Sequence, residues 1–166
     1  MQDYCVKDYC VKDYYTRDIR AITMYDTRRH ICFNVGLVMR RVYDYYEKRL
    51  SVFGLSPPQY FVFNALWMGD GITVGELGER VSLDSSTLTG ILDRMEKTGY
   101  VERRPNLDDR RSVLVFLSAK AQELGPRILE FAYELDATLR QPFSQEEMDT
   151  FEQVLRSLAE APDYWK

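Results

Sequence analysis

Residues 73–99 read TVGELGERVSLDSSTLTGILDRMEKTG and predict two short helices joined by a three-residue turn. Thr73 and Glu76 have capping-box spacing, in which the threonine oxygen accepts from the backbone of the third helical residue and the glutamate reaches back to the helix start. Asp84 is placed to cap the second helix. Gly99 then ends that helix from the position where glycine is favoured. Two short helices joined in this way indicate a helix-turn-helix.

The second of these helices, expected from Ser85 to about Thr98, has two different faces. Its apolar stripe has the spacing i, i+3, i+4, i+7 and consists of Leu88, Ile91, Leu92 and Met95. The opposite face begins with small hydroxyl side chains, so its first turn offers hydroxyls and free backbone N–H groups to phosphates and base edges. An arginine two turns later can reach a phosphate. The candidate contacts are Ser85, Ser86, Thr87, Thr89 and Arg94.

A β-hairpin is expected directly after this helix, with strands at 100–104 and 113–117 and a polar tip between them. The net charge of the chain is −4, and residues 119–166 carry 10 acidic against 5 basic side chains, so nucleic-acid binding depends on local charge. Residues 94–111 hold six cations and four acids. An arginine at the tip suits the electronegative minor groove, and a neighbouring aspartate can hold its guanidinium. The candidates are Asp109, Arg110 and Arg111.

Long amphipathic helices flank this centre, at about 28–53 and 118–161. Apolar residues recur every three or four positions from Arg28 onward, which predicts a helix of about six turns that stops before Gly54. Pro58 can open the next helix, whose apolar positions are Phe61, Ala65, Trp67 and Met68. Helical periodicity resumes at Ser118, and a second capping box, Ser144 with Glu147, begins the last helix.

The end helices have apolar faces broader than the small centre can cover. Two-fold dimerisation through them would place two recognition helices about one DNA turn apart, roughly 34 Å. The alternative is a monomer in which both ends pack on the centre. The expected fold is therefore mainly α with a small β-hairpin wing, a winged helix-turn-helix over about 56–118 with terminal dimerisation helices.

The beginning of the chain differs from the rest. Residues 3–7 and 8–12, DYCVK twice, form a duplication of period five, which is too short for a solenoid repeat. Residues 1–27 are therefore expected to be an N-terminal extension, either a mobile arm or a docking arm. The domain proper is expected over 28–166.

Composition excludes several classes of protein. The 166 residues suffice for one domain, and 45% hydrophobic with 29% charged residues is typical of a soluble globular protein. No apolar run approaches a membrane span and no signal peptide is present, so a cytoplasmic protein without membrane association is expected. One histidine, His30, argues against a metal site. Enzyme and nucleotide-binding motifs such as GxSxG and GxxxxGK are missing, so neither catalysis nor a cofactor is expected.

The chain resembles the MarR family of winged-helix transcriptional regulators, from about residue 29 to its end. The resemblance rests on three segments in the family's order, which read LDSSTLT at 83–89, LDRMEKTGYV at 92–101 and DRRSVLV at 109–115. It implies a homodimer that binds pseudo-palindromic double-stranded DNA through the helix beginning at Ser85 and through a wing in which Asp109 pairs with Arg111. It also implies repression that a small molecule or an oxidant relieves.

Segments 30–33 and 56–60 are most similar to the branch of this family that senses organic hydroperoxides. There a cysteine near the start of the first helix is the sensor, and tyrosines hydrogen-bond its thiolate. Cys32 falls on the sensor position and Tyr46 matches one tyrosine, whereas Gly36 and Pro57 replace the others. The alternative for Cys32 is a small buried apolar residue.

A small-molecule site is the other signal that the resemblance implies. Aromatic residues of the first two helices are candidates for its lining, with an arginine meeting an anionic group. The expected effector is an aromatic acid or its thioester. Aromatic residues at helical spacing are also typical of a core, and a protein-interaction module that has lost DNA binding remains a further alternative. The candidate lining is Arg40, Arg41, Tyr46, Tyr60, Phe63 and Trp67.

Overall fold

The computed structural model describes residues 5–6, 9–10 and 30–160, in two compact units, 1–42 and 43–166. In the first unit, β1 (Cys5–Val6) pairs antiparallel with β2 (Tyr9–Cys10), a pairing that the five-residue repeat did not predict. The rest of the expected extension 1–27 and the expected helix start at Arg28 lie outside the described residues. Helix α2 (Ile31–Leu50) begins in the first unit and ends in the second.

The first turn after α2 is a 3₁₀-helix, η3 (Ser51–Phe53), which stops at Gly54 in the left-handed backbone region, with φ 68°. Helix α3 (Pro57–Trp67) follows, and Gln59 caps it by accepting from the Ser56 N–H at 2.8 Å. It therefore begins one residue before the expected Pro58. Of the positions expected on its apolar face, Met68 lies beyond the end of the helix and is 75% exposed, whereas Trp67 is 37% exposed and stacks on Phe63. The fully inward positions lie earlier in the helix. Those positions are Tyr60, Val62, Phe63, Ala65 and Leu66.

The predicted helix-turn-helix is confirmed. Helix α4 (Val74–Val81) has the expected box, since the Glu76 N–H donates to Thr73 Oγ1 at 3.2 Å and the Thr73 N–H donates to Glu76 Oε2 at 2.7 Å. Helix α5 (Ser85–Lys97) is capped by Asp84, and Gly99 ends it with φ 75°. The apolar stripe of α5 is buried against α3 and α4, which leaves its polar face to solvent.

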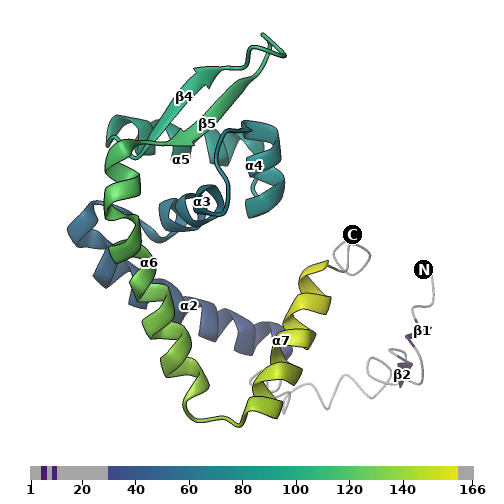
Figure 1. The fold of residues 1–166 in the computed structure, drawn as a ribbon. Helices are drawn as coiled ribbons and strands as arrows, with labels where there is room; N and C mark the ends of the chain where they lie inside the picture. The colour runs from purple at the N-terminus through teal and green to yellow at the C-terminus, as the bar shows by residue number, and fades with distance from the viewer. Residues whose placement is uncertain (1–4, 7–8, 11–29, 161–166) are drawn as a thin grey trace, which may run out of the picture. The chain divides into compact units, whose positions relative to one another are not determined.

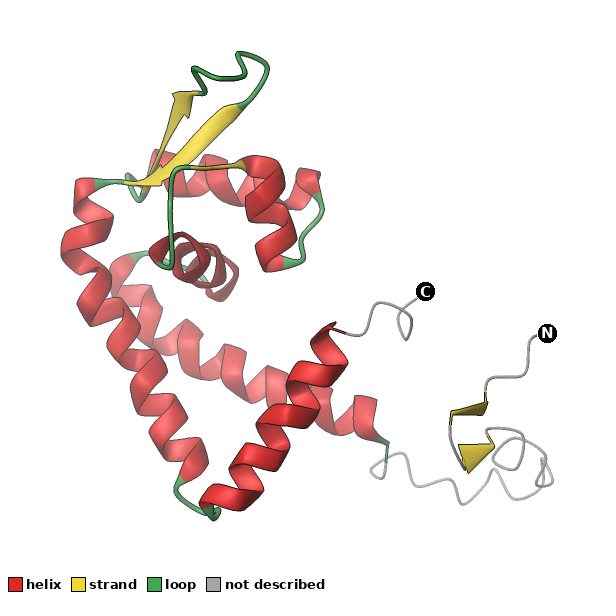
Figure 2. Cartoon of the chain, turned by 45° about the vertical axis from the view of Figure 1, so that its right-hand side comes forward, coloured by secondary structure: helices red, strands yellow, loops and turns green. Residues whose placement is uncertain are grey.

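The wing is part of a three-stranded antiparallel sheet (Figures 1 and 2). Its order is β3 (Ile72–Thr73), β5 (Val113–Leu117) and β4 (Val101–Pro105). The two longer strands pair from Val101 opposite Leu117 to Pro105 opposite Val113, and they extend away from the helices to the loop 106–112 in Figure 2. The hairpin prediction is confirmed, but β3 was missed because two residues are too few to show a periodicity.

The last two helices are α6 (Ala119–Arg140) and α7 (Gln145–Glu160). Ser118 caps α6 by accepting from the Ala121 N–H at 3.1 Å, and its own hydroxyl donates to the Gly99 carbonyl at 2.6 Å. Lys120 Nζ donates to the Thr98 carbonyl at 2.8 Å. The start of α6 is therefore fastened to the two residues that follow the recognition helix α5.

Helices α3 and α6 meet where Trp67 lies over Gly125. A Cβ atom built on Gly125 would stand 2.0 Å from Trp67 Cζ3, closer than two carbon atoms can approach. The indole also stacks on Phe63, with ring centroids 5.7 Å apart. Only glycine fits at this point of α6 without moving the indole.

Gly125→Ala is therefore expected to destabilise the fold by about 1–3 kcal/mol, because overpacking outweighs the better helix propensity of alanine. Urea unfolding followed by tryptophan fluorescence measures this loss. Gly90→Ala is the matched control, because nothing lies within 4 Å of the added Cβ on α5. That change should stabilise by about 0.5–1 kcal/mol. Equal effects at the two sites would mean that Trp67 does not restrict Gly125.

Candidate nucleic-acid interface

The exposed face of α5 begins with a turn held by the Asp84 carboxylate. Its Oδ1 accepts from the N–H groups of Ser86 at 3.0 Å and Thr87 at 2.9 Å. Both hydroxyls donate to it as well, Ser86 Oγ to Oδ1 at 2.5 Å and Thr87 Oγ1 to Oδ2 at 2.6 Å. The prediction of free backbone N–H groups is therefore wrong for these two residues. The Asp84 carboxylate therefore ties the turn together, and the side chains of the turn are exposed.

The other predicted side chains of α5 are exposed as well. Thr89 Oγ1 donates to the Ser85 carbonyl at 2.7 Å, one turn earlier. Among the described residues, no hydrogen bond is recorded for the Ser85 hydroxyl and no ion pair for Arg94. The structure thus places all five predicted contact residues on one helix. Two of them, Ser85 and Arg94, keep their side-chain donors for a ligand.

The tip of the wing is built by short polar contacts. Asp109 Oδ1 accepts from Arg111 Nε at 3.1 Å and from the Arg111 backbone N–H at the same distance. The Asn106 side chain accepts from the Asp108 N–H and donates to Ser112 Oγ, each at 3.0 Å. The Arg111 side chain is nevertheless 92% exposed. The expected pairing of an aspartate with a tip arginine is present in the structure, and it presents a guanidinium to solvent.

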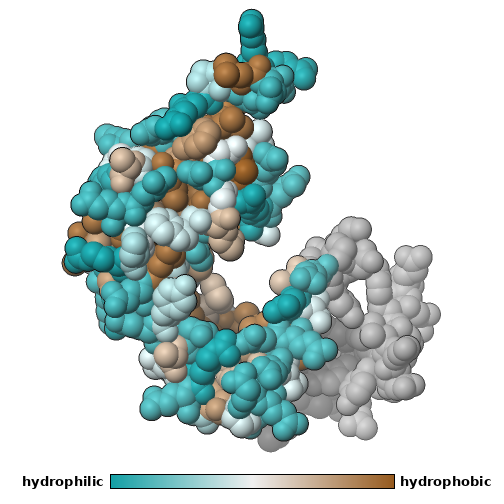
Figure 3. All heavy atoms as spheres, viewed as in Figure 1, coloured by the Kyte–Doolittle hydropathy of each residue, from teal (hydrophilic) through white to brown (hydrophobic). Residues whose placement is uncertain are grey.

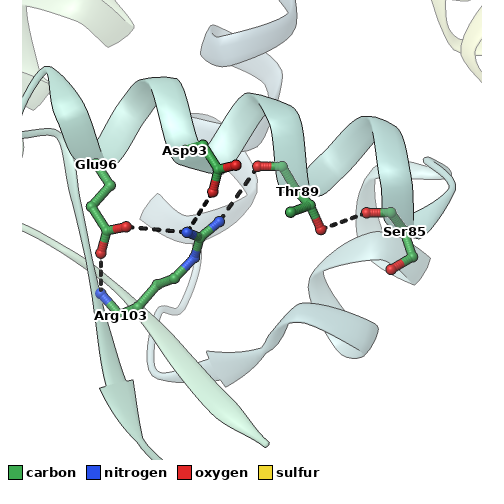
Figure 4. A network of polar contacts seen from close by, with 5 residues as sticks. All are labelled: Ser85, Thr89, Asp93, Glu96 and Arg103. Carbon is green, nitrogen blue, oxygen red and sulfur yellow. Dashed lines mark hydrogen bonds and ion pairs between the residues drawn. The ribbon is translucent and has the colours of Figure 1, made fainter.

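Arg103 joins the wing to the recognition helix (Figure 4). From β4, its Nη1 lies 2.6 Å from Asp93 Oδ1 and 3.1 Å from Glu96 Oε2, and its Nη2 donates to the Thr89 carbonyl at 3.4 Å. The Arg103 backbone N–H also donates to Glu96 Oε1 at 3.3 Å. Only 22% of the arginine side chain is exposed. Arg103 therefore fixes the wing relative to α5.

Two of the cations counted in this region are paired with acids of the protein itself. Arg103 is neutralised by Asp93 and Glu96, and Arg104 pairs with Glu102 at 2.9 Å while it lies over the Phe116 ring. Both guanidinium groups are therefore paired within the protein. In the described part of the chain, the cations of this region that have no recorded ion pair are Arg94, Lys97 and Arg110.

A surface hollow of about 520 Å³ lies between the wing and the start of α4. Thr73, Val74 and Gly75 line one side, and the wing residues Asn106, Asp109, Arg111, Ser112 and Val113 line the other. On the face seen in Figure 3, the surface of the wing is mainly hydrophilic with a small hydrophobic patch. The exposed surface formed by the wing and the start of α4 is thus suited to a polar, charged partner.

The predicted effector residues do not form an open site of their own. Tyr46 and Tyr60 are buried and stacked, with ring centroids 4.5 Å apart, and Phe63 is buried between the rings of Trp67 and Tyr100. Burial raises the pKa of Tyr60. Within the described residues its hydroxyl has no hydrogen-bond partner. A ligand would reach these rings only if they moved.

The remaining predicted residues lie on α2. Arg40 and Arg41 are exposed, as is the Cys32 thiol in the single chain. In the described ranges, no helix is long and apolar enough to cross a membrane. Those ranges also contain no cluster of three or more histidine, cysteine or acidic residues that could hold a metal ion.

A helix-turn-helix whose second helix is exposed and is followed by an antiparallel hairpin defines the winged helix-turn-helix class. The MarR family model matches residues 55–113. The chain belongs to the MarR family: it is 34% identical over 109 residues to the organic hydroperoxide resistance transcriptional regulator of Bacillus subtilis, with 66% of this chain and 71% of that protein covered.

Two other relatives extend the comparison. The regulator TtmR of Methylorubrum extorquens is 38% identical over 94 residues, which cover 57% of this chain and 48% of TtmR, so the chain matches about half of that protein's length. The crystal structure of a MarR variant from E. coli complexed with operator DNA superposes with a TM-score of 0.72 and 25% identity. The superposition covers 85% of this chain and 98% of that one.

Proposed function

We propose that this chain is a homodimeric repressor that binds a pseudo-palindromic operator in double-stranded DNA. One observation carries this proposal. The first turn of α5 is held by the Asp84 carboxylate and exposed, and the wing, which Arg103 bonds to α5, presents the Arg111 guanidinium to solvent. A helix for the major groove and a cation for the adjacent minor groove are the two parts of winged-helix recognition. The resemblance to a MarR variant solved with operator DNA supports the same role.

Exposed apolar side chains on the C-terminal helices support dimerisation. They lie at the end of α6, in the turn that follows and along α7, and a single protomer leaves them in water. A second copy related by a two-fold axis would cover them and would align two recognition helices with two half-sites. The residues are Tyr133, Leu139, Phe143, Phe151, Val154 and Leu155.

Release from DNA is assigned to a small effector, an aromatic acid or its thioester, that opens the packed rings around Tyr46 and Tyr60. The orphaned Tyr60 hydroxyl supports this assignment, because a buried polar group without a partner gains free energy from a ligand that bonds it. Calorimetric titration with a panel of such acids and thioesters tests the effector class. Heat of binding accompanied by loss of DNA affinity is expected, and no heat from any of them would contradict it.

The DNA-binding role is tested by fluorescence anisotropy of the purified protein with its own upstream DNA at two salt concentrations. Specific binding that weakens steeply with salt is expected, since each neutralised phosphate adds about −0.9 to the slope of log affinity against log salt. Binding equal to that of a scrambled duplex would overturn the role and would favour an interaction module that has lost DNA recognition.

Oxidation of Cys32 is the second candidate for the signal that releases the protein from DNA. It is favoured by the exposure of the thiol and by the similarity to a hydroperoxide resistance regulator. In the same assay, an organic hydroperoxide should abolish binding and a thiol reductant should restore it, because a sulfenic acid is reversible. A Cys32→Ser variant should ignore the oxidant. If wild-type binding is indifferent to the hydroperoxide, the aromatic-acid effector remains.

Arg111→Ala is expected to weaken operator binding about tenfold with no loss of thermal stability, because its side chain is 92% exposed and, among the described residues, pairs with Asp109 alone. Anisotropy titrations over a salt series measure the change. Arg111→Lys is the control that keeps the charge but lacks the Nε group bonded to Asp109. It should restore the salt slope and only part of the affinity. Unchanged affinity in the alanine variant would remove the wing from the interface.

A further inference from the structure

Three hydroxyl groups at the start of α5 already donate their protons within the protein. Ser86 and Thr87 donate to the two oxygens of Asp84, and Thr89 donates to the Ser85 carbonyl. The O–O distances to the Asp84 carboxylate are 2.5 and 2.6 Å, as expected for hydroxyls that donate to an ionised group, and the distance to the Ser85 carbonyl is an ordinary 2.7 Å. All three side chains are exposed on the helix face proposed to enter the major groove.

The direction of these bonds is fixed by their acceptors. A backbone carbonyl only accepts, and an ionised carboxylate only accepts. The hydroxyls of Ser86 and Thr87 hold the pKa of Asp84 well below its ordinary value, so the carboxylate is ionised at neutral pH. Each hydroxyl has one proton, which is therefore committed, and only its lone pairs remain for a ligand. Among the described residues no group donates to these three oxygens.

Few groups of DNA can use such lone pairs. Phosphate oxygens, purine N7, guanine O6 and thymine O4 are all acceptors, whereas the only donors in the major groove are the 6-amino group of adenine and the 4-amino group of cytosine. We propose that Ser86, Thr87 and Thr89 act as obligate acceptors that select adenine and cytosine amino groups and do not bind phosphates. The inference rests on the proposed function, whose interface is supported separately by the wing and the family comparison.

The same geometry assigns phosphate contacts to other groups. The Ser85 hydroxyl has no recorded partner in the described part of the chain, and Arg94 lies exposed on the same helix, so both keep their donors. The DNA groups that Ser86 and Thr87 contact should therefore be hydrogen-bond donors, whereas those that Ser85 and Arg94 contact should be acceptors such as phosphate oxygens.

A single substitution should reverse the polarity of one contact. In Asp84→Asn, the amide oxygen still caps the helix, as asparagine caps about as well as aspartate. The amide nitrogen, in the place of Oδ2, donates to Thr87 Oγ1 instead of accepting from it. Thr87 then turns its proton outward and becomes a donor. The variant should fold normally yet prefer a base acceptor such as N7 at the position that Thr87 contacts.

The experiment first selects a binding duplex from a random pool with the full chain. Single bases of that duplex are then replaced by purine, which lacks the adenine 6-amino group, by pyrimidin-2-one, which lacks the cytosine 4-amino group, or by 7-deazapurines, which lack N7. Affinities are measured for the wild type and for Ser86→Ala, Thr87→Val, Thr89→Val and Asp84→Asn.

Removing one contacted amino group is expected to cost wild type about tenfold in affinity, and the matching 7-deaza base less than twofold. That amino-group sensitivity should vanish in the corresponding hydroxyl variant, and Asp84→Asn should become sensitive to 7-deaza bases. The inference is overturned if positions linked to these hydroxyls respond to loss of N7, or if the hydroxyl variants leave every sensitivity unchanged. If no duplex is selected over random DNA, the proposed function itself fails.

Discussion

Replacing Arg103 with alanine is expected to lower operator affinity by tenfold or more, the largest loss from any single charge in this protein. Arg103 makes three side-chain contacts to α5, with Asp93, Glu96 and the Thr89 carbonyl. Without it the wing loses its fixed distance from the recognition helix. Two carboxylates on that helix also lose their counter-charge beside the DNA phosphates. The affinity falls for both reasons, whereas the loss of stability should be only about 1 kcal/mol, because Asp93 and Glu96 are well exposed.

Arg104→Ala is the matched control. It removes the same side chain and the same charge from the next residue of β4, but Arg104 is paired with Glu102 on its own strand and, in the described part of the chain, makes no hydrogen bond or ion pair to α5. Anisotropy titrations at equal salt should show a loss for Arg104→Ala several times smaller than for Arg103→Ala. Equal losses would show that only net charge matters. Adding Asp93→Asn and Glu96→Gln to the Arg103 variant should recover the charge-dependent part and leave the positional part.

Leu88→Ala is expected to lower the free energy of unfolding by about 2–5 kcal/mol, the range for truncating a buried leucine. Leu88 is fully buried on the inner face of α5, and its Cδ2 lies 3.6 Å from a Cβ built on Gly78 of α4, so it fills the space between the two helices. Chemical denaturation measures the loss. DNA binding should weaken only as far as the folded fraction falls.

Leu107→Ala is the control for this substitution. The same three heavy atoms are removed at the wing tip, where Leu107 is 90% exposed, and the free energy of unfolding should stay within about 0.5 kcal/mol of wild type. If both variants lost the same stability, the buried stripe of α5 would not be the core of the helix-turn-helix.

Local signals predicted most of this unit, and contacts between elements explain what they missed. The caps at Thr73 and Asp84 and the stop at Gly99 depend on residues within a few positions of one another, so sequence reasoning could find them and the structure confirms them. The role of Arg103 depends on side chains 7 and 10 residues earlier, across a turn between helix and strand. The sequence allowed Arg103 only to be counted among the local cations, because spacing alone does not reveal which acid it meets.

The same contrast between local and long-range contacts applies to the residues of the proposed interface. Helical periodicity predicted the polar face of α5. It could not predict whether the hydroxyls on that face donate or accept, because this depends on the position of the Asp84 carboxylate, to which Ser86 and Thr87 both donate. The approach of Trp67 to Gly125 likewise joins two helices 58 residues apart in sequence. Gly125 is followed by Pro126, and this pair inside a helix indicates an irregularity. The pair does not indicate that the Trp67 ring lies where a Gly125 side chain would be.

The junction at Ser118 and Lys120 has a mechanical consequence. These two side chains bond the carbonyls of Gly99 and Thr98, and the Ser118 N–H donates to the Tyr100 carbonyl at 3.0 Å. The first turn of α6 is therefore bonded to residues 98–100, the segment that connects α5 to β4. A change in the direction of α6 would therefore be transmitted to the segment that joins the recognition helix to the wing. In the proposed dimer, a signal that acts on α6 would in this way change the distance between the two recognition helices without a rearrangement inside the helix-turn-helix.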